Sequence, residues 1–203
     1  MKEATTPEKR AYHHGDLRAG LLAAIRQLVE EKGPDQFSVA EAARLAGVST
    51  AAPYKHFKDR DEMLKAAALD NMARQSTEMR DALAPLPPKC VERIEALGQL
   101  YIECAMREPG MFRLTFALSS GHNRDPSLIA SGKAMFGLVQ HEVASFLGID
   151  PFDPEAERRA MMLWSFVHGL SFLLIDGKVE AMELDLDLPQ ILHDMAQRVM
   201  VDH

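Results

Sequence analysis

The chain has 203 residues, of which 47% are hydrophobic and 26% charged, and its net charge is −7. This balance is that of a folded globular protein and excludes an intrinsically disordered chain. The longest apolar-rich stretch, residues 161–175, is too short to cross a bilayer, and the first ten residues lack the apolar segment of a signal sequence. Because Cys90 and Cys104 form no C-x-x-C motif, we expect two inert thiols in a reducing compartment, the cytoplasm.

The negative charge is concentrated in the second part of the chain. Residues 1–60 contain ten Lys or Arg against eight Asp or Glu, whereas residues 61–203 contain thirteen against twenty-two. An acidic surface repels nucleic-acid phosphates. Any DNA-binding surface is therefore expected within the first 60 residues.

The pattern of apolar residues predicts an all-α fold. Alternation of period two is confined to residues 184–188, just before a proline, while apolar residues elsewhere recur at helical spacing. The first helix is expected over about residues 17–32, where Gly33-Pro34 ends the pattern.

A short helix, a tight turn and a second short helix follow. Ser38 begins an S-x-x-E capping box at the start of a helix that Gly47 ends. Ser49 or Thr50 then caps a third helix that runs to about residue 57. Residues 37–57 are therefore predicted to form a helix-turn-helix.

Pro53 lies inside this predicted third helix. A proline has no N–H and normally breaks the interior of a helix. With Thr50 as the N-cap, Pro53 is the third helical residue, whose amide has no partner within the helix. We therefore expect the helix to tolerate it, with Phe57 in the core and the Tyr54 ring packed on the bundle.

Asp59 is expected to cap a long helix that ends before a cluster of three prolines at residues 85–88. This cluster is the predicted boundary between an N-terminal domain, residues 14–74, and a C-terminal domain, residues 85–203. The second domain is predicted to contain five helices, which gives about nine in the whole chain. Their expected ranges are 90–107, 111–118, 126–147, 155–176 and 188–201.

The segment from Ala43 to Phe57 reads A-x-x-x-G-V-S-x-x-x-x-Y-x-H-F, and a new helix start, D-R-D-E-M-L, follows from Asp59. This combination resembles the DNA-binding signature of the TetR family of transcription regulators over about residues 14–74. Pro53 stands where the family commonly has an aliphatic residue. The stretch 107–114 and the motif Trp164-x-x-x-His168-Gly169 resemble one subclass of TetR C-terminal domains.

The resemblance implies that the third helix enters the major groove of operator DNA. Small side chains there allow the backbone to approach the bases, while cationic and hydroxyl side chains can reach phosphates. The candidate DNA-binding residues are Ser38, Ser49, Thr50, Ala51, Tyr54, Lys55, His56 and Lys58.

Residues 161–175 are apolar on almost every side, so a helix formed there must be covered all round. A second copy of the chain can cover what one domain leaves open, most simply through a four-helix bundle with the last helix. The family dimerises in the same way. The candidate interface residues are Val167, Leu170, Leu174, Ile191, Leu192, Met195 and Val199.

Apolar and aromatic residues of the second domain can either form a plain core or line a cavity for a small apolar or amphipathic ligand. The cavity follows mainly from the resemblance, with His122, His141 or His168 as a polar group for the ligand. The candidate pocket residues are Met106, Met111, Phe112, Phe116, Met135, Phe136, Trp164, His168 and Phe172.

Two other classes of function are weighed against a regulator. The chain has no H-E-x-x-H or E-x-x-H metal motif, no phosphate-binding P-loop and no G-x-S-x-G elbow, so we expect no enzyme and no cofactor. A helical interaction protein without DNA binding is the other alternative. We predict a dimeric, cytoplasmic repressor that a small-molecule inducer releases from a palindromic operator; activation is the open variant of this mechanism.

Overall fold

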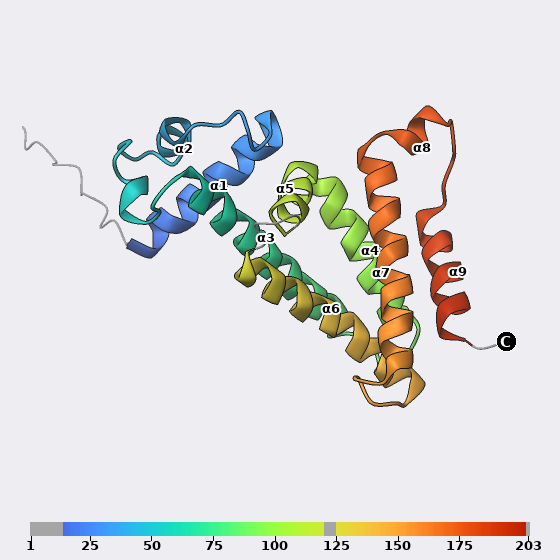
Figure 1. Cartoon of the computed structure of the whole chain (residues 1–203). Coiled ribbons are helices and arrows are strands. Elements are labelled where there is room, and N and C mark those ends of the chain that lie inside the picture. Colours follow the sequence, from blue (N-terminus) through green and yellow to red (C-terminus); the bar gives the residue numbers. More distant parts are fainter. Residues whose placement is uncertain (1–13, 120–124, 202–203) are drawn as a thin grey trace, which may run out of the picture. The chain divides into compact units, whose positions relative to one another are not determined.

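The computed structural model describes residues 14–119 and 125–201, with side chains from Leu17 onward. The described residues form nine α-helices and one 3-10 helix, η1, and contain no strand, which confirms the predicted all-α fold (Figure 1). The elements are α1 (His14–Lys32), α2 (Val39–Leu45), η1 (Pro53–Lys55), α3 (Arg60–Leu83), α4 (Glu92–Arg107), α5 (Pro109–Ser119), α6 (Pro126–Leu147), α7 (Pro154–Ile175), α8 (Lys178–Ala181) and α9 (Leu188–Met200).

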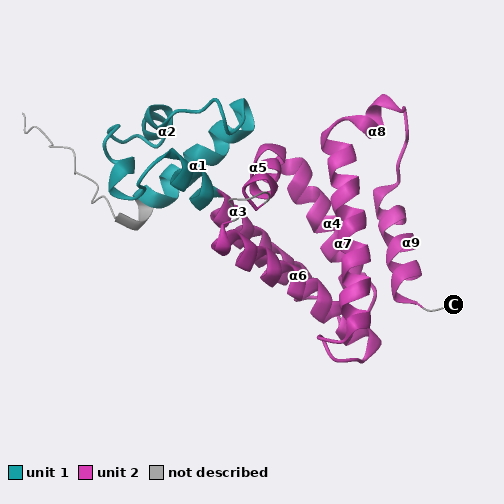
Figure 2. Ribbon diagram, viewed as in Figure 1, with its two compact units in different colours: residues 1–67 teal, residues 68–203 magenta. Residues whose placement is uncertain are grey.

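The chain divides into two compact units, residues 1–67 and 68–203, so that the division falls inside α3 (Figure 2). The domain boundary predicted at the prolines after residue 84 stays a prediction. None of the described helices is both long enough and apolar enough to cross a membrane.

In the first unit, α1 packs against α2 and buries Leu21 and Ile25 completely. The predicted capping box begins α2. The Glu41 amide donates to Ser38 Oγ over 3.2 Å, and the Ser38 amide donates to Glu41 Oε2 over 3.1 Å. Two of the amides that a helix start leaves without partners are thereby satisfied.

The predicted third helix is much shorter in the structure. Only Pro53–Lys55 is helical, as a single 3-10 turn, and no side chain caps it, so the prediction of a Ser49 or Thr50 cap is wrong. The Lys55 amide donates to Ala52 O over 3.1 Å and the His56 amide to Pro53 O over 2.9 Å. The helical turn begins at the proline itself, where the fixed φ of proline suits a first helical position and no backbone hydrogen bond is lost.

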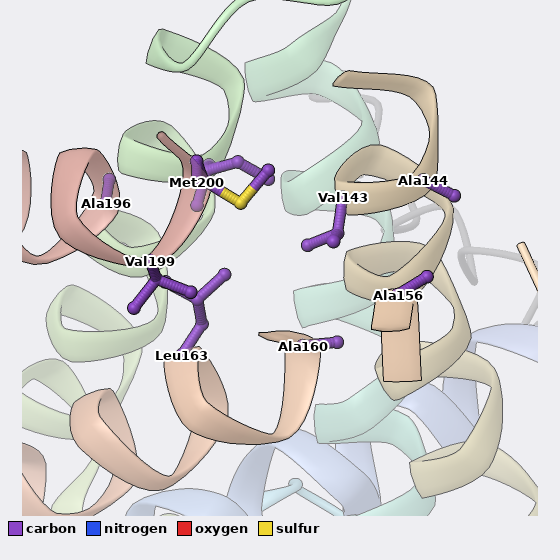
Figure 3. Close-up of a cluster of buried hydrophobic side chains, with 9 residues drawn as sticks. Val143, Ala144, Ala156, Ala160, Leu163, Ala196, Val199 and Met200 are labelled. Atoms are coloured by element: carbon purple, nitrogen blue, oxygen red, sulfur yellow. The ribbon is translucent and has the colours of Figure 1, made fainter. Parts of the chain in front are cut away.

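The second unit is built from α4, α6, α7 and α9, which pack against one another. Close approach of α6 and α7 is possible because Ala144, Ala156 and Ala160 are small and fully buried. Figure 3 shows the larger side chains of the same cluster, Val143, Leu163, Val199 and Met200, gathered between these helices and α9. The short helix α8, which the sequence pattern does not predict, joins α7 to α9.

A partly buried guanidinium joins three segments of this unit. Arg93 Nε and Nη2 donate to the two carboxylate oxygens of Glu142 over 2.6 and 2.9 Å. Nη1 donates to Leu83 O over 2.8 Å and to Leu86 O over 3.0 Å. Arg93 therefore ends α3 by satisfying its last carbonyl, and it ties the start of α4 to α6.

We expect Arg93→Ala to lower the free energy of unfolding of the second unit by about 3 kcal/mol, because it leaves the buried carboxylate of Glu142 without its arginine partner and removes the side-chain donor to Leu86 O; Leu83 O still accepts from the Leu86 amide. Urea denaturation followed by the fluorescence of Trp164 measures this change. The matched control is Arg158→Ala. The Arg158 side chain is 61% accessible and forms an ion pair with Glu155. The control should change stability by less than about 0.5 kcal/mol, and equal losses for the two variants would contradict the role assigned to Arg93.

Candidate functional site

The turn of the helix-turn-helix in the first unit is fixed by backbone hydrogen bonds. Gly47 has φ +70°, a left-handed conformation that glycine adopts without strain. The Val48 amide donates to Ala43 O over 2.9 Å, and the Gly47 amide donates to Arg44 O over 3.1 Å. This is the Schellman pattern of a helix end, and it sets the direction in which the chain leaves α2.

The segment after the turn has one buried side and one exposed side. Pro53 and Phe57 are buried, whereas Ala51, Tyr54 and Lys55 are exposed. The prediction that the Tyr54 ring packs on the bundle is wrong, since the side chain is 58% exposed. The shortened helix explains the difference: with Pro53 and Phe57 in the core, the residue directly after Pro53 faces outward.

The other candidate DNA-binding residues fall into two groups. Ser49, Thr50 and Lys58 are exposed and His56 is half-buried, so solvent reaches all four. Ser38 is also exposed, but its hydroxyl already accepts from the Glu41 amide and donates to the Glu41 carboxylate in the capping box. Within the described part of the chain, Lys55 and Lys58 form no ion pair, so both ammonium groups are available to phosphates.

An arginine that the sequence analysis did not single out orders this unit. The Arg60 guanidinium lies 4.9 Å from the centre of the Phe37 ring and donates to Phe37 O and Pro34 O. It thus joins the start of α3 to the loop before α2. Arg60 directly follows Asp59, the N-cap of α3, whose carboxylate accepts from the Glu62 amide over 2.8 Å. In the sequence, this position of Arg60 indicates only the start of a helix.

The second unit contains a cavity of about 350 Å³ between α3, α4, α5, α6 and α7. Its walls are mostly apolar, and this size is typical of small-molecule sites. The lining residues are Met72, Gln75, Met79, Tyr101, Phe112, Thr115, Phe116, Ser119, Leu128, Ile129, Gly132, Lys133, Met135, Phe136, Val139 and Trp164.

Five of the nine candidate pocket residues line this cavity, namely Phe112, Phe116, Met135, Phe136 and Trp164. The other four lie elsewhere. Met111 is completely buried in the core, and Met106 is 52% exposed. His168 contacts the rings of Phe112 and Phe116, and Phe172 contacts the ring of Phe112, but neither residue lines the cavity.

The lining residues contributed by α3 and most of those from α6 are not among the predicted ones. Met72, Gln75 and Met79 recur at helical spacing, so they share one side of α3, but the same spacing is also typical of a plain helix face. Only the fold shows that this side of the helix borders a cavity. Of the histidines considered as polar groups, His141 is exposed and His122 lies outside the described residues.

Tyr101 connects the cavity wall to His168. Trp164 Nε1 donates to the Tyr101 oxygen over 3.3 Å, and the Tyr101 oxygen lies 2.9 Å from His168 Nδ1. Because the indole can only donate, the Tyr101 hydroxyl is free to donate to His168, whose proton then resides on Nε2. Burial lowers the pKa of His168 and raises the pKa of Tyr101, so both groups are neutral at pH 7.

This arrangement predicts acid sensitivity. The unfolded chain binds a proton on His168 near the ordinary pKa of about 6.5, whereas the folded chain binds it only at lower pH. Between the pKa of His168 in the unfolded chain and its lower pKa in the folded chain, the unfolded state binds more protons than the folded state. The stability of the second unit should therefore fall as pH decreases from about 7 to 5.

Urea titrations at a series of pH values test this expectation. His168→Gln should make the stability decrease less with falling pH, and His141→Gln, at an exposed position of α6, is the matched control. An identical pH profile for wild type and His168→Gln would contradict the expectation.

Two family descriptions match the chain. "Bacterial regulatory proteins, tetR family" matches residues 21–67, and "Tetracyclin repressor-like, C-terminal domain" matches residues 94–199. The first match contains the helix-turn-helix segment, and the second contains most of the cavity. The chain therefore belongs to the TetR family, and it is a DNA-binding transcription regulator of that family. The finer subclass suggested by Trp164, His168 and Gly169 stays a prediction.

Individual relatives agree with this assignment. The chain is 30% identical over 103 residues to the nucleoid occlusion factor SlmA of Marinomonas sp. (strain MWYL1), a match that covers 50% of this chain and 51% of SlmA. The matched part thus spans about half the length of that curated relative. A solved protein of unknown function from Rhodococcus sp. RHA1 is 28% identical, with a TM-score of 0.79 over 95% of this chain and 97% of its own.

A second solved structure shares the fold alone. It is a TetR family transcription regulator from Marinobacter aquaeolei VT8, 16% identical, with a TM-score of 0.66 over 93% of this chain and 97% of its own.

The described residues contain no group of three or more side chains suited to hold a metal ion.

Proposed function

We propose that this regulator is a dimeric repressor that binds a palindromic operator and is released from it by a small-molecule inducer. The exposed side of the segment after Gly47 carries the proposal. There, Tyr54 and Lys55 are presented to solvent by a turn fixed through backbone hydrogen bonds. In a dimer, two such segments would enter successive major grooves, about 34 Å apart. The proposal places the protein with bacterial DNA in the cytoplasm, acting by binding and not by catalysis.

The coupling between inducer and operator would run through α3. Its first turns bury Met63 and Ala67 in the first unit, and its later turns supply Met72, Gln75 and Met79 to the cavity of the second. A ligand that prefers one position of this helix lowers the affinity for DNA, and DNA lowers the affinity for that ligand by the same factor.

Loss of the outward side chains should weaken DNA binding without unfolding the protein. Selection of random duplexes on the purified protein first supplies the operator. Lys55→Ala and Tyr54→Ala should each reduce operator affinity by about tenfold in gel-shift titrations. Lys55→Ala should also make the slope of log affinity against log salt less negative by about 0.9 for each subunit.

Lys178→Ala, at an exposed position of α8, is the control for a lost lysine and should bind as the wild type does. Unchanged operator affinity in both Lys55→Ala and Tyr54→Ala would overturn the assignment of the DNA-binding side.

The dimer interface is proposed on the open side of α7 and α9. Val167, Leu192 and Val199 cannot belong to it, because they are already buried in the core of their own chain. Leu170, Leu174, Ile191 and Met195 are half-buried and can contribute at its edge. The exposed positions of α7 that complete this surface are Met161, Met162, Ser165, Gly169 and Leu173.

Gly169→Arg tests this surface. A Cβ atom added at Gly169 meets no other atom within 4 Å in the single chain, and the position is exposed, so the fold should accept arginine while the dimer should not. Sedimentation should show a dimer for the wild type and a monomer for the variant, with unchanged helical circular dichroism. Leu184→Asp, an exposed leucine between α8 and α9, is the control. A fully dimeric Gly169→Arg protein would place the interface elsewhere.

A further inference from the structure

The charges around the cavity differ from those of the unit that contains it. Residues 68–203 carry twelve Lys or Arg and twenty Asp or Glu. None of these carboxylates lines the cavity, and Lys133 is the one charged residue among its lining residues. Among the described residues, the acidic unit thus presents one charge at its cavity, and this positive charge attracts an anion and repels a cation.

Lys133 is exposed on α6, beside Gly132, and forms no ion pair within the described ranges 14–119 and 125–201. A Cβ atom added at Gly132 would lie 3.8 Å from Met72 Cε of α3, so the lysine follows the point of α6 that faces α3 at the cavity. An ammonium group at the edge of an apolar cavity keeps its hydration until a ligand arrives, so its desolvation costs little before binding.

The other polar groups of the wall are mostly occupied. Thr115 Oγ1 donates to Met111 O over 2.8 Å, and Ser119 Oγ donates to Thr115 O over 3.0 Å. The Tyr101 hydroxyl is shared between Trp164 and His168. Among the described residues, the Gln75 amide and the Lys133 ammonium are the lining donors without a protein partner. A carboxylate accepts from both kinds of donor.

The apolar part of the wall is rich in rings. Five of the thirteen aromatic residues of the chain line the cavity, namely Tyr101, Phe112, Phe116, Phe136 and Trp164. Phe136 and Trp164 meet edge to face at an interplanar angle of 63° with centroids 6.0 Å apart, and Phe112 and Phe116 are tilted with centroids 4.9 Å apart. Such walls offer both faces and edges, which favour a flat aromatic ligand over a flexible alkyl chain.

From these observations we propose that the ligand of the cavity is an aromatic carboxylate, with its ring among Phe116, Phe136 and Trp164 and its charge at Lys133. This inference rests on the proposed function in taking the cavity as the inducer site. Its chemical content can be tested separately from the effect on DNA.

Matched pairs of acid and primary amide test the proposal: benzoate and benzamide, 2-naphthoate and 2-naphthamide, and decanoate and decanamide. Trp164 is the single tryptophan of the chain and lines the cavity, so its fluorescence reports binding directly. We expect at least one aromatic acid to bind about tenfold more tightly than its own amide and more tightly than decanoate.

Variants of the full-length protein assign the preference to one side chain. Lys133→Ala should abolish the difference between acid and amide and leave amide binding unchanged, while Lys133→Arg should retain the preference. Lys178→Ala is the control, because it removes a positive charge on α8, far from Lys133 in the sequence. The proposal is overturned if no aromatic acid binds more tightly than its amide, if decanoate binds more tightly than the aromatic acids, or if Lys133→Ala keeps the acid preference.

Gel shifts with the selected operator separate this proposal from the function on which it rests. An aromatic acid that binds through Lys133 without weakening operator binding supports the ligand class and contradicts the inducer mechanism. Neutral amides that bind more tightly than the acids and release DNA support the mechanism and overturn the ligand class.

Discussion

The need to cover helix α7 organises the second unit. Its apolar side chains occupy nearly all sides, so α4, α6 and α9 pack against it, and the alanines of α6 and α7 allow these two helices to approach closely. The cavity lies where this packing is incomplete, beside Trp164, because the bulky rings of α5 and α6 leave space between them. The strip of α7 around Gly169 stays uncovered within one chain. One constraint thus accounts for the core, the cavity and the surface available to a second copy.

Much of this architecture can be predicted from the sequence, because its signals are local. The Ser38 capping box, the end of α2 at Gly47 and the helix start after Asp59 depend on residues within one turn of the chain, and the structure forms each of them. The cavity depends on which helix faces are brought together by packing over long distances. Periodicity shows that Met72 and Met79 share a side of α3, but a core and a cavity wall give the same pattern. For the same reason, the sequence pattern does not distinguish the core residues Val167 and Leu192 from interface residues, whereas their burial in the single chain does.

The segment after Gly47 shows how a proline alters a predicted element. The sequence pattern fits a full helix to residue 57, yet only Pro53–Lys55 is helical, with the proline as its first residue. The outward position of Tyr54 follows from this shift. Because proline has few backbone conformations even in the unfolded chain, fixing this short turn costs less conformational entropy than fixing an ordinary residue. If the segment binds DNA as proposed, a short element fixed in this way would present its side chains in nearly the same geometry before and after contact, which would limit the entropy lost on binding.

The three thioethers in the cavity wall, from Met72, Met79 and Met135, have a consequence for the evolution of such a regulator. Methionine is unbranched and polarisable, so its side chain can follow the outline of different ligands with little change in energy. A wall of this kind would discriminate less strictly between ligands of different size. A bacterium that meets a new compound of the same chemical type would therefore obtain a partial response from the existing protein, which later substitutions could sharpen without rebuilding the fold.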